Sequence, residues 1–575
     1  MIPTPALCSK LSINNLLAPA FFITLFSMAA NAVVPLPTDF YRVRYDDNPD
    51  PTLRDEPFLA WHEDLSQAGY VEREYFFSGT AQEYRYVDDA GQSPLAEVRP
   101  GRQGQYTTRM IVRRPNQVKN FNGVVYLEIL NATAGYDNAP HWNLTYDSII
   151  ADGAAYVGVT YSDLTADFLS TFWGEAHDIC PANDPNPTPC GSDTRNKSRY
   201  LKANGTAILN IPRRAFTWDI LNQAAALIRA GAYRGPFQNF TVDTVIAVGY
   251  SQSARYVTTY GNSFYPSYSE LGCTAEQEDQ GLCTTPIVDG FIVAAGGSNS
   301  SEMDGVGSHP PGDRRNCENA LNREAPCIEG EIEPPAVDPL ANDLPKFMRF
   351  TTESDIKSVR ARQDEGVNNP ADYDQPYLRT YEAAGTSHVD FWGTVVNRRV
   401  GEYQFGIPAD PNPASGCDKP MNPIRTGIPL SAIQHRMWRW IKFDEPPPPN
   451  RLMEWEGDFS TFDANFNPAV DWLRDEDGNA LGGVRPARMN VPLGAYNGQN
   501  TFSGGFSPQL IFCTTIIGAY EDFTSEEILN RYGTRQSFAA LTWWNAYLAY
   551  LDGFLLAVDA ATILQEAKNY EGLPE

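Results

Sequence analysis

The stretch that decides the fold is Thr244-Val245-Ile246-Ala247-Val248-Gly249-Tyr250-Ser251-Gln252-Ser253. It opens with an apolar run that is typical of a buried strand. A helix-like run over 254–260 follows, so Ser251 is predicted at a sharp turn between a strand and a helix. Small residues on both sides suit a strained turn in which backbones approach closely. This is the pattern of a nucleophile elbow, with Ser253 in place of the usual glycine.

A second stretch, Gly296–Ser300, has the same spacing and also follows a strand-like run. The residues after it, 301–307, show no helical apolar periodicity. An elbow needs the helix, whose N-terminus also stabilises negative charge. The sequence therefore favours Ser251 over Ser298 as a nucleophile.

A serine hydroxyl needs a histidine base, and in folds with this elbow the chain order is serine, acid, histidine. Three histidines follow Ser251. His309 lies in a Pro/Gly-rich stretch, and His435 lies inside a predicted helix. His388 follows the strand-like run 377–381, in a loop expected to lie over the strand ends. We therefore predict His388 as the base.

The orienting acid is expected just after the strand that precedes His388. The strand-like run Lys346–Phe350 is followed by two threonines and then by Glu353 and Asp355. Asp355 is predicted to lie in the loop beyond the strand, and we favour it. Glu353 stays open as the alternative.

Two backbone N–H groups are expected to bind the oxyanion. One belongs to Gln252, the residue after the nucleophile. The other belongs to the loop after the strand-like run Val124–Leu130, at Ala132 or its neighbour. Asn131 and His141 lie on or near this loop, where they either border the pocket or cap turns.

Strand-like and helix-like runs alternate from about residue 105 onward. Near-continuous apolar strands separated by helices predict an α/β fold with a mostly parallel sheet covered on both faces. The expected strands are Tyr106–Val112, Val124–Leu130, Ala155–Tyr161, Thr244–Val248, Gly290–Ala294 and Lys346–Phe350, and the expected helices include Ala215–Ile228 and Ser431–Phe443.

The chain is predicted to divide at a stiff proline-rich spacer, Glu445–Asn450. Residues 33–443 are expected to form the core, with insertions at about 163–210 and 264–345 that are rich in Pro, Asn, Asp and Gly. Residues 444–575 form a C-terminal extension. We expect it to pack on the core, although the sequence alone leaves a separate domain open.

The N-terminal 32 residues carry one charged side chain, Lys10, and an apolar run over 16–26. They close with Ala30-Asn31-Ala32, the small-x-small pattern of a signal peptidase site. The sequence thus predicts a signal peptide cleaved after Ala32 and a secreted or periplasmic protein, with a buried N-terminal helix as the alternative. The run is too short to span a bilayer, so no stable membrane insertion is expected.

Cysteine usage agrees with export. Eight cysteines remain after residue 32, and six of them form three couples spaced ten residues apart. Eight cysteines allow 105 pairings, so connectivity stays open, as do free thiols. No Cys-x-x-Cys or His-x-x-x-His spacing indicates zinc. The expected disulfides are Cys180–Cys190, Cys273–Cys283, Cys317–Cys327 and, by elimination, Cys417–Cys513.

The 575-residue chain has a net charge of −27 and is 42% hydrophobic. It is long enough to bury one large core or two ordinary ones. So acidic a protein is repelled by phosphate backbones and anionic membranes, which argues against nucleic acid as a partner. No cofactor and no metal are expected.

The chain resembles the alpha/beta-hydrolase domain-containing family of secreted and bacterial proteins. The resemblance covers about residues 60–500, and it implies an α/β-hydrolase core with Ser251 as nucleophile and His388 as base. It implies no substrate, because one fold hosts many reactions. The stretches that carry it are Tyr126–Ala132, Gly249–Ser253, Thr352–Asp355, Ala384–His388 and Asp477–Arg485.

These observations predict a secreted serine hydrolase that cleaves small-molecule or polymeric carboxylic esters through an acyl-enzyme. Two alternatives stay open. One is a binding or cell-surface protein on a hydrolase scaffold without catalysis, and the other is a serine peptidase or amidase. The acyl and alcohol groups of the substrate and the oligomeric state do not follow from the sequence.

Overall fold

The computed structural model describes most of the chain from Val33 to Glu575. The segment 1–32 and Cys180, Cys190, Cys273, Cys283, Cys317 and Cys327 lie outside the described residues, as do Ser298 and His309. The described ranges are 33–43, 56–86, 98–171, 173, 199–202, 204–265, 267–269, 286–296, 345–358, 377–405, 416–462, 468–505 and 507–575.

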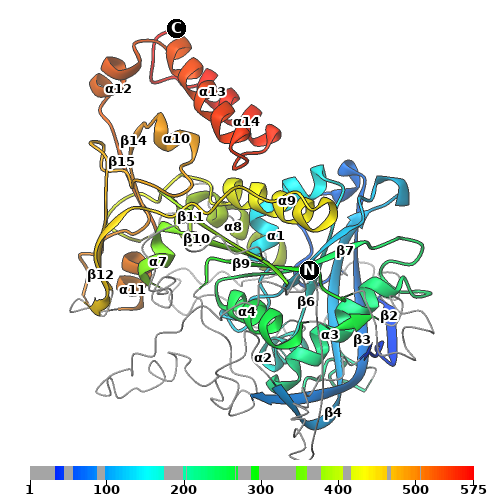
Figure 1. Ribbon diagram of the computed structural model, residues 1–575. Helices are drawn as coiled ribbons and strands as arrows, with labels where there is room; N and C mark the ends of the chain where they lie inside the picture. The colour runs from blue at the N-terminus through cyan, green and yellow to red at the C-terminus, as the bar shows by residue number, and fades with distance from the viewer. Residues whose placement is uncertain are drawn as a thin grey trace, which may run out of the picture.

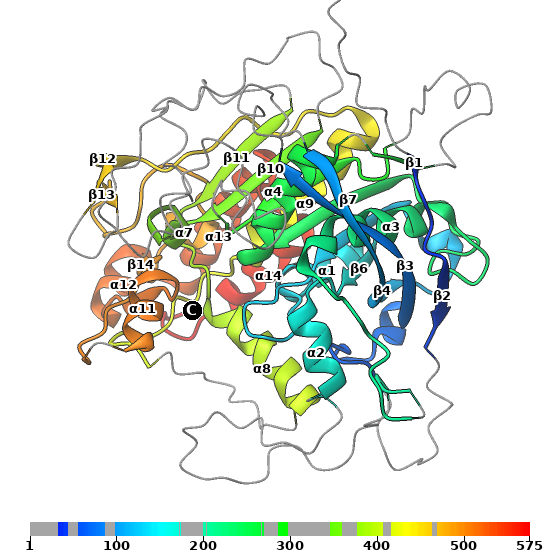
Figure 2. The same ribbon diagram turned by 90° about the horizontal axis from the view of Figure 1, so that it is seen from below.

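A nine-stranded sheet forms the centre of the molecule (Figures 1 and 2). Six neighbouring strands, from β11 to β6, are parallel, and the remaining three continue the sheet in antiparallel pairs. In sheet order the strands are β11 (Leu378–Ala383), β10 (Lys346–Thr352), β9 (Gly290–Ala294), β7 (Thr244–Tyr250), β5 (Val124–Ile129), β6 (Ala155–Val159), β4 (Val98–Pro115), β3 (Tyr70–Tyr86) and β2 (Asp39–Arg42).

Helices cover both faces of this sheet, which explains the continuous apolar strands. Every residue of β5, β6, β7 and β9 is buried. Helices α1, α8 and α9 lie together on one face, and α3 and α4 lie on the other (Figure 1). The helices of this part are α1 (Pro140–Ala151), α2 (Asp163–Thr171), α3 (Thr217–Ala230), α4 (Gln252–Phe264), α7 (Glu353–Ser358), α8 (Phe391–Phe405) and α9 (Gly427–Phe443).

The predicted α/β class is confirmed, and each strand and helix expected above is present, although β4 begins eight residues before the predicted Tyr106. Strand β3, its long antiparallel pairing with β4, and the helices α1 and α8 were not predicted. Strand β9 lies inside the range 264–345 that was expected to be an insertion. That range is therefore interrupted by a core strand, which pairs with β7 on one side and β10 on the other.

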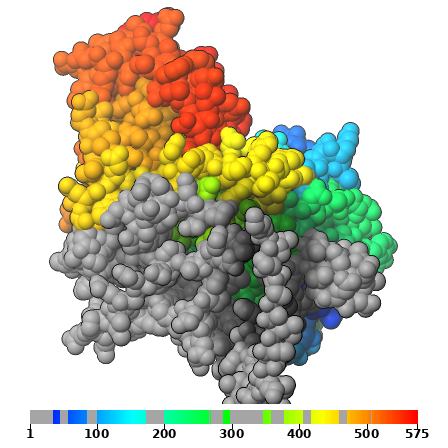
Figure 3. Space-filling view, in the orientation of Figure 1, coloured from blue at the N-terminus to red at the C-terminus, as the bar shows by residue number. Residues whose placement is uncertain are grey.

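The described residues of the C-terminal part form two small antiparallel sheets and five helices. Helices α12, α13 and α14 project away from the central sheet (Figures 1 and 3). No helix among the described residues is long and apolar enough to cross a membrane. The elements are β12 (Trp455–Phe462), β13 (Pro468–Trp472), α10 (Ala487–Asn490), β14 (Gly494–Asn497), α11 (Pro508–Thr515), β15 (Ala519–Asp522), α12 (Ser525–Tyr532), α13 (Arg535–Leu551) and α14 (Ala557–Lys568).

This C-terminal part is tied to the core by backbone and by a disulfide. The Val484 N–H donates to the Glu382 carbonyl at 2.7 Å, and the Ala384 N–H donates to the Val484 carbonyl at 3.0 Å, so the chain continues the sheet beyond β11. The disulfide Cys417–Cys513 is present, as expected by elimination. Outside the central sheet, β1 (Val33–Val34) pairs with β8 (Tyr268–Ser269), and short 3-10 helices cover Leu65–Ala68, Val118–Asn120 and Arg214–Phe216.

Candidate active site

Ser251 lies at the turn between β7 and α4, at the carboxyl end of the sheet. Its φ of 62° falls in the left-handed region, which is strained for a non-glycine residue. The Ser251 N–H donates to the Ala294 carbonyl at the end of β9, at 3.0 Å. Such strain persists only where surrounding contacts impose it. These contacts hold the serine at the apex of the turn.

The serine that replaces the usual glycine of the elbow has a structural use. The Ser253 hydroxyl lies 3.0 Å from both the N–H and the carbonyl of Tyr250, so it bonds within the turn. Close approaches explain two neighbouring glycines. A Cβ at Gly249 would lie 2.5 Å from the Ser253 carbonyl oxygen, and one at Gly296 would collide with the Ala254 side chain. Gly296 therefore serves the packing of α4 against β9.

The His388 side chain lies in the loop after β11 and is paired with Asp355. The distance from His388 Nδ1 to Asp355 Oδ1 is 2.6 Å. Asp355 is fully buried, and its other oxygen accepts hydrogen bonds from the Thr352 N–H at 3.0 Å and the Thr352 hydroxyl at 2.5 Å. The His388 N–H donates to the Ser354 hydroxyl at 2.8 Å. The backbone and the ring of His388 are thus both held by the start of α7.

Glu353, the alternative acid, points elsewhere. One of its carboxylate oxygens accepts the Gly385 N–H at 2.8 Å, and the other lies 2.8 Å from Arg474 Nη2. Both oxygens are therefore used to fix the His388 loop and the C-terminal part. Asp355 is the carboxylate that contacts the imidazole, and it lies in the short helix α7 rather than in the predicted loop.

The elbow and the histidine loop meet through Tyr250. Its hydroxyl donates to the His388 carbonyl at 2.8 Å, and the two rings are 5.2 Å apart between centroids. His388 is thus packed beside the residue that precedes Ser251. Among the described residues, no hydrogen bond joins the Ser251 hydroxyl to the imidazole. Serine–histidine hydrogen bonds are often long in unliganded enzymes and tighten when substrate binds.

The predicted oxyanion groups also lie together. The Ala132 N–H donates to the side-chain oxygen of Gln252 at 3.2 Å, and the Gln252 amide nitrogen donates to the Tyr161 hydroxyl at 3.1 Å. The Asn131 side chain donates to the Tyr250 carbonyl at 3.0 Å and so joins the loop after β5 to the elbow. The Gln252 side chain thus occupies one of the two N–H groups predicted to bind an oxyanion.

The other histidines near the sheet have structural partners. His141 is fully buried in α1, with Nε2 2.9 Å from the Gln434 side-chain oxygen, and burial lowers its pKa to about 4. His435 in α9 pairs with Asp152 at 2.9 Å. In the part of the chain that the structure describes, no group of three or more His, Cys, Asp or Glu side chains is placed to hold a metal ion.

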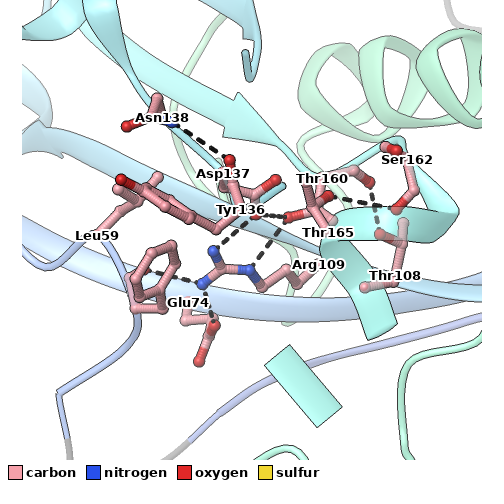
Figure 4. Close-up of polar contacts among 12 residues, drawn as sticks. Leu59, Glu74, Thr108, Arg109, Tyr136, Asp137, Asn138, Thr160, Ser162 and Thr165 are labelled. Atoms are coloured by element: carbon pink, nitrogen blue, oxygen red, sulfur yellow. Dashed lines mark hydrogen bonds and ion pairs between the residues drawn. The ribbon is translucent and has the colours of Figure 1, made fainter. Parts of the chain in front are cut away.

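A buried charge network, which the sequence reading missed, anchors the loop that carries Ala132 (Figure 4). Arg109 on β4 is fully buried, and its guanidinium lies 2.9 Å from both the Glu74 and the Asp137 carboxylates. Its Nε donates to the Thr160 hydroxyl at 3.1 Å. Asp137 belongs to the loop after β5, so Arg109 fixes that loop against β3, β4 and the end of β6.

The same network binds a segment inside the first predicted insertion. Arg199 lies 2.6 Å from Glu74, and the Tyr200 hydroxyl donates to that carboxylate at 2.9 Å. Burial acts to raise the pKa of Glu74, but the guanidinium groups of Arg199 and Arg109 outweigh it and hold the pKa below its ordinary value. Glu74 is therefore an ionised carboxylate that links three segments far apart in sequence.

Comparison with known proteins agrees with this architecture. The model of the alpha/beta hydrolase domain family matches residues 46–565. The chain therefore belongs to the alpha/beta hydrolase domain family. The match extends through most of the C-terminal part, so the family includes that part as well as the sheet.

Similar solved structures are distant. They include the rice cell wall degrading esterase LipA from Xanthomonas oryzae, with 11% identity over 39% of this chain and 42% of that one (TM-score 0.18). The glucuronoyl esterase from Solibacter usitatus shares 9% identity over 50% and 64% of the two chains (TM-score 0.22). An a/b serine hydrolase without lid from Xanthomonas campestris shares 10% over 57% and 92% (TM-score 0.24). No curated protein matches the chain.

Proposed function

We propose that this protein is a serine hydrolase that cleaves carboxylic esters, with Ser251 as nucleophile, His388 as base and Asp355 as the residue that orients the imidazole. The observation that carries the proposal is the 2.6 Å hydrogen bond between His388 and Asp355, beside the strained turn that presents Ser251. A serine hydroxyl becomes nucleophilic only when such a pair removes its proton.

In the first half of the proposed reaction, the Ser251 hydroxyl oxygen attacks the ester carbonyl carbon while its proton passes to His388 Nε2. Asp355 accepts the Nδ1–H and stabilises the imidazolium that forms. The carbonyl oxygen becomes an oxyanion, which the backbone N–H groups of Gln252 and Ala132 stabilise. The carbon–oxygen bond to the alcohol then breaks, and the alcohol takes the proton from His388.

In the second half, water attacks the acyl group on Ser251 and gives its proton to His388. The carboxylic acid leaves as the proton returns to the serine oxygen. During both halves the Ala132 N–H has to be free for the substrate. The Gln252 side chain, which accepts that N–H at 3.2 Å, has to turn away first.

Export is part of the proposal. The sequence pattern at 30–32 supports cleavage of a signal peptide after Ala32, and the Cys417–Cys513 disulfide suits an oxidising compartment. The substrate is then an ester outside the cytoplasm, either a small molecule or a polymer. The net charge of −27 favours neutral over polyanionic substrates.

The test compares Ser251→Ala and His388→Gln with His435→Gln, a variant of a histidine that is paired to an aspartate outside the site. We expect the first two to lose about 10³-fold or more of the turnover of short p-nitrophenyl esters, because residual catalysis without the triad is low. The His435→Gln variant is expected to keep its turnover. Full activity of Ser251→Ala would contradict the proposal.

Two further measurements separate the alternatives. A fluorophosphonate probe is expected to label Ser251 in the wild-type chain, since covalent capture needs an activated serine. Absence of labelling would instead indicate a binding protein on a hydrolase scaffold. Matched p-nitrophenyl esters and p-nitroanilides distinguish an esterase from a peptidase or amidase, and faster amide turnover would contradict the ester assignment.

A further inference from the structure

Helix α13 presents an unusually apolar surface to solvent. Six of its side chains, which we call the α13 face, are each between 40% and 58% exposed. Three of them are aromatic, and the rings of Trp543 and Tyr547 are stacked almost parallel with centroids 5.4 Å apart. The α13 face comprises Leu541, Trp543, Trp544, Tyr547, Leu548 and Leu551.

The rest of the helix is already used for packing within the chain. Phe538, Ala539, Thr542 and Ala546 are buried, and this side of α13 contacts α10 and α14. At 100° per residue these four positions and the α13 face occupy different sides of the helix. The α13 face therefore lies on the outside of the projecting helical part, where Figure 3 shows the C-terminal residues standing clear of the core.

This face carries no charge that would select a charged partner. Residues 536–551 contain no Asp, Glu, Lys or Arg, whereas the whole chain has a net charge of −27. A contiguous exposed apolar patch on a protein marks a contact surface. Its occupant has to be apolar and uncharged, and it has to tolerate the negative charge of the remaining surface.

We propose that the α13 face binds the same face of a second copy of this chain across a two-fold axis. A two-fold interface needs only one patch that is complementary to itself, and aromatic and leucine side chains on a straight helix pack against each other in this way. At roughly half of a 200 Å² side chain each, the six residues offer about 600 Å². Flanking residues such as Tyr550 and Val558, both more than 40% exposed, bring this toward the about 800 Å² that each partner contributes to a stable interface.

The lack of basic residues on the α13 face favours a protein copy over an anionic lipid surface. Helices that lie on membranes use Lys and Arg to attract anionic headgroups, and the α13 face has none. In a dimer the two negative chains repel each other at a distance while the neutral faces touch. Salt screens this repulsion, so the dimer is expected to tighten as NaCl is raised from about 10 to 300 mM.

The experiment is sedimentation velocity on the full chain between about 1 and 100 µM. We expect a species of twice the chain mass that becomes monomeric in the Trp544→Glu variant, which places a charge in the centre of the face. Tyr233→Glu is the matched control, because Tyr233 is 73% exposed and lies on the core. Melting temperature and ester turnover of each variant show whether it is folded.

A second variant keeps the test decisive if Trp544→Glu does not fold. Tyr547→Cys is expected to form a disulfide-linked dimer under mild oxidation, while Tyr233→Cys and the wild-type chain are not. A wild-type chain that stays monomeric at 100 µM in 300 mM NaCl overturns the proposal. So does a dimer that survives Trp544→Glu, and so does a monomer that binds neutral phosphatidylcholine vesicles through the α13 face.

Discussion

The central sheet and the projecting helices contain the same types of apolar side chain but differ in how far these side chains are buried. Around the sheet, aromatic and branched side chains are almost fully buried, and even charged groups such as Arg109 and Glu74 are buried in pairs. In α13, by contrast, Trp543 and Trp544 are about half exposed. The two regions therefore differ in the burial of their apolar side chains rather than in composition. Those around the sheet stabilise the fold, and those on α13 are exposed and can contact a partner.

The boundary between the part that holds the candidate site and the projecting helices does not lie at the proline-rich spacer. Residues well beyond the spacer contact the candidate site, because Arg474 pairs with Glu353 at 2.8 Å and the Val389 N–H donates to the Ile516 carbonyl at 3.0 Å. A Cβ at Gly498 would lie 2.6 Å from the Ser354 N–H nitrogen, so the chain there passes directly over α7. Helices α12, α13 and α14 project away from the central sheet (Figure 1).

The largest effect is expected at the candidate site, at the carboxyl end of the sheet. Asp355→Asn leaves the geometry but favours the wrong imidazole tautomer, so kcat on short esters should fall about 10⁴-fold. Asp152→Asn is the matched control, since Asp152 pairs with His435 outside the candidate site. Steady-state kinetics with an unchanged melting temperature checks the result, and equal losses in the two variants would remove Asp355 from the proposed triad.

The next largest effect concerns stability. Arg109→Met leaves the buried Asp137 carboxylate without its cation and leaves Glu74 with Arg199 alone, and it is expected to cost about 3–5 kcal/mol in the free energy of unfolding. Arg439→Met removes an exposed pair with Glu445 and should cost less than about 1 kcal/mol. Urea unfolding of both variants measures the difference. Similar costs would mean that the buried network adds nothing beyond a surface pair.

A smaller effect depends on pH and tests the boundary between the two regions. Burial, with the negative charge of Asp147 adding to it, raises the pKa of Asp559 on α14 to about 6 from 3.8. The folded chain thus holds a proton between pH 3.8 and 6 that the unfolded chain has lost. The stability linked to this proton is complete below about pH 4 and is lost as the pH rises through 6.

Asp559→Asn removes that loss. The variant should match the wild-type chain near pH 4 and exceed its stability by about 3 kcal/mol at pH 7–8. Thermal unfolding across this pH range measures the difference, with Asp552→Asn at the exposed end of α13 as control. A gain in stability that is the same at every pH would show that the pKa of the Asp559 carboxyl does not change on folding.

The smallest expected effect is in the α13 face itself. Trp544→Ala removes a large side chain that is half exposed, so the stability of the monomer should change by no more than about 0.5 kcal/mol. Chemical unfolding at low protein concentration measures this change. A loss of 3 kcal/mol or more, as in a buried core position, would place Trp544 in the folding core and abolish the contrast between the two regions.

The elbow was predictable because its signals are local: an apolar strand, a turn and a helix in direct succession around Ser251. The chain order then selected His388, and its place after β11 is confirmed. The start of α1 was not predictable. Its N-terminus has no capping side chain of its own, and Glu128 on β5 instead accepts the His141 and Trp142 N–H groups at 2.9 and 3.2 Å.

The Arg109 network escaped prediction for a related reason. Its partners lie 28 and 35 residues away in sequence, and charged residues along a strand normally face water. Only the fold brings β3, β4 and the loop after β5 together so that each charge is neutralised. Contacts made between distant segments leave no periodic or local pattern in the sequence.

The contact between Gln252 and Ala132 gives the resting protein an internal competitor. A substrate carbonyl that displaces this glutamine exchanges one neutral acceptor for another and gains little from the exchange. An oxygen that carries negative charge forms a stronger, charge-assisted hydrogen bond and gains more. Under the proposed mechanism, the displaced amide thereby offsets binding of the ground state and leaves the stabilisation to the tetrahedral species, which is the condition under which binding energy accelerates a reaction.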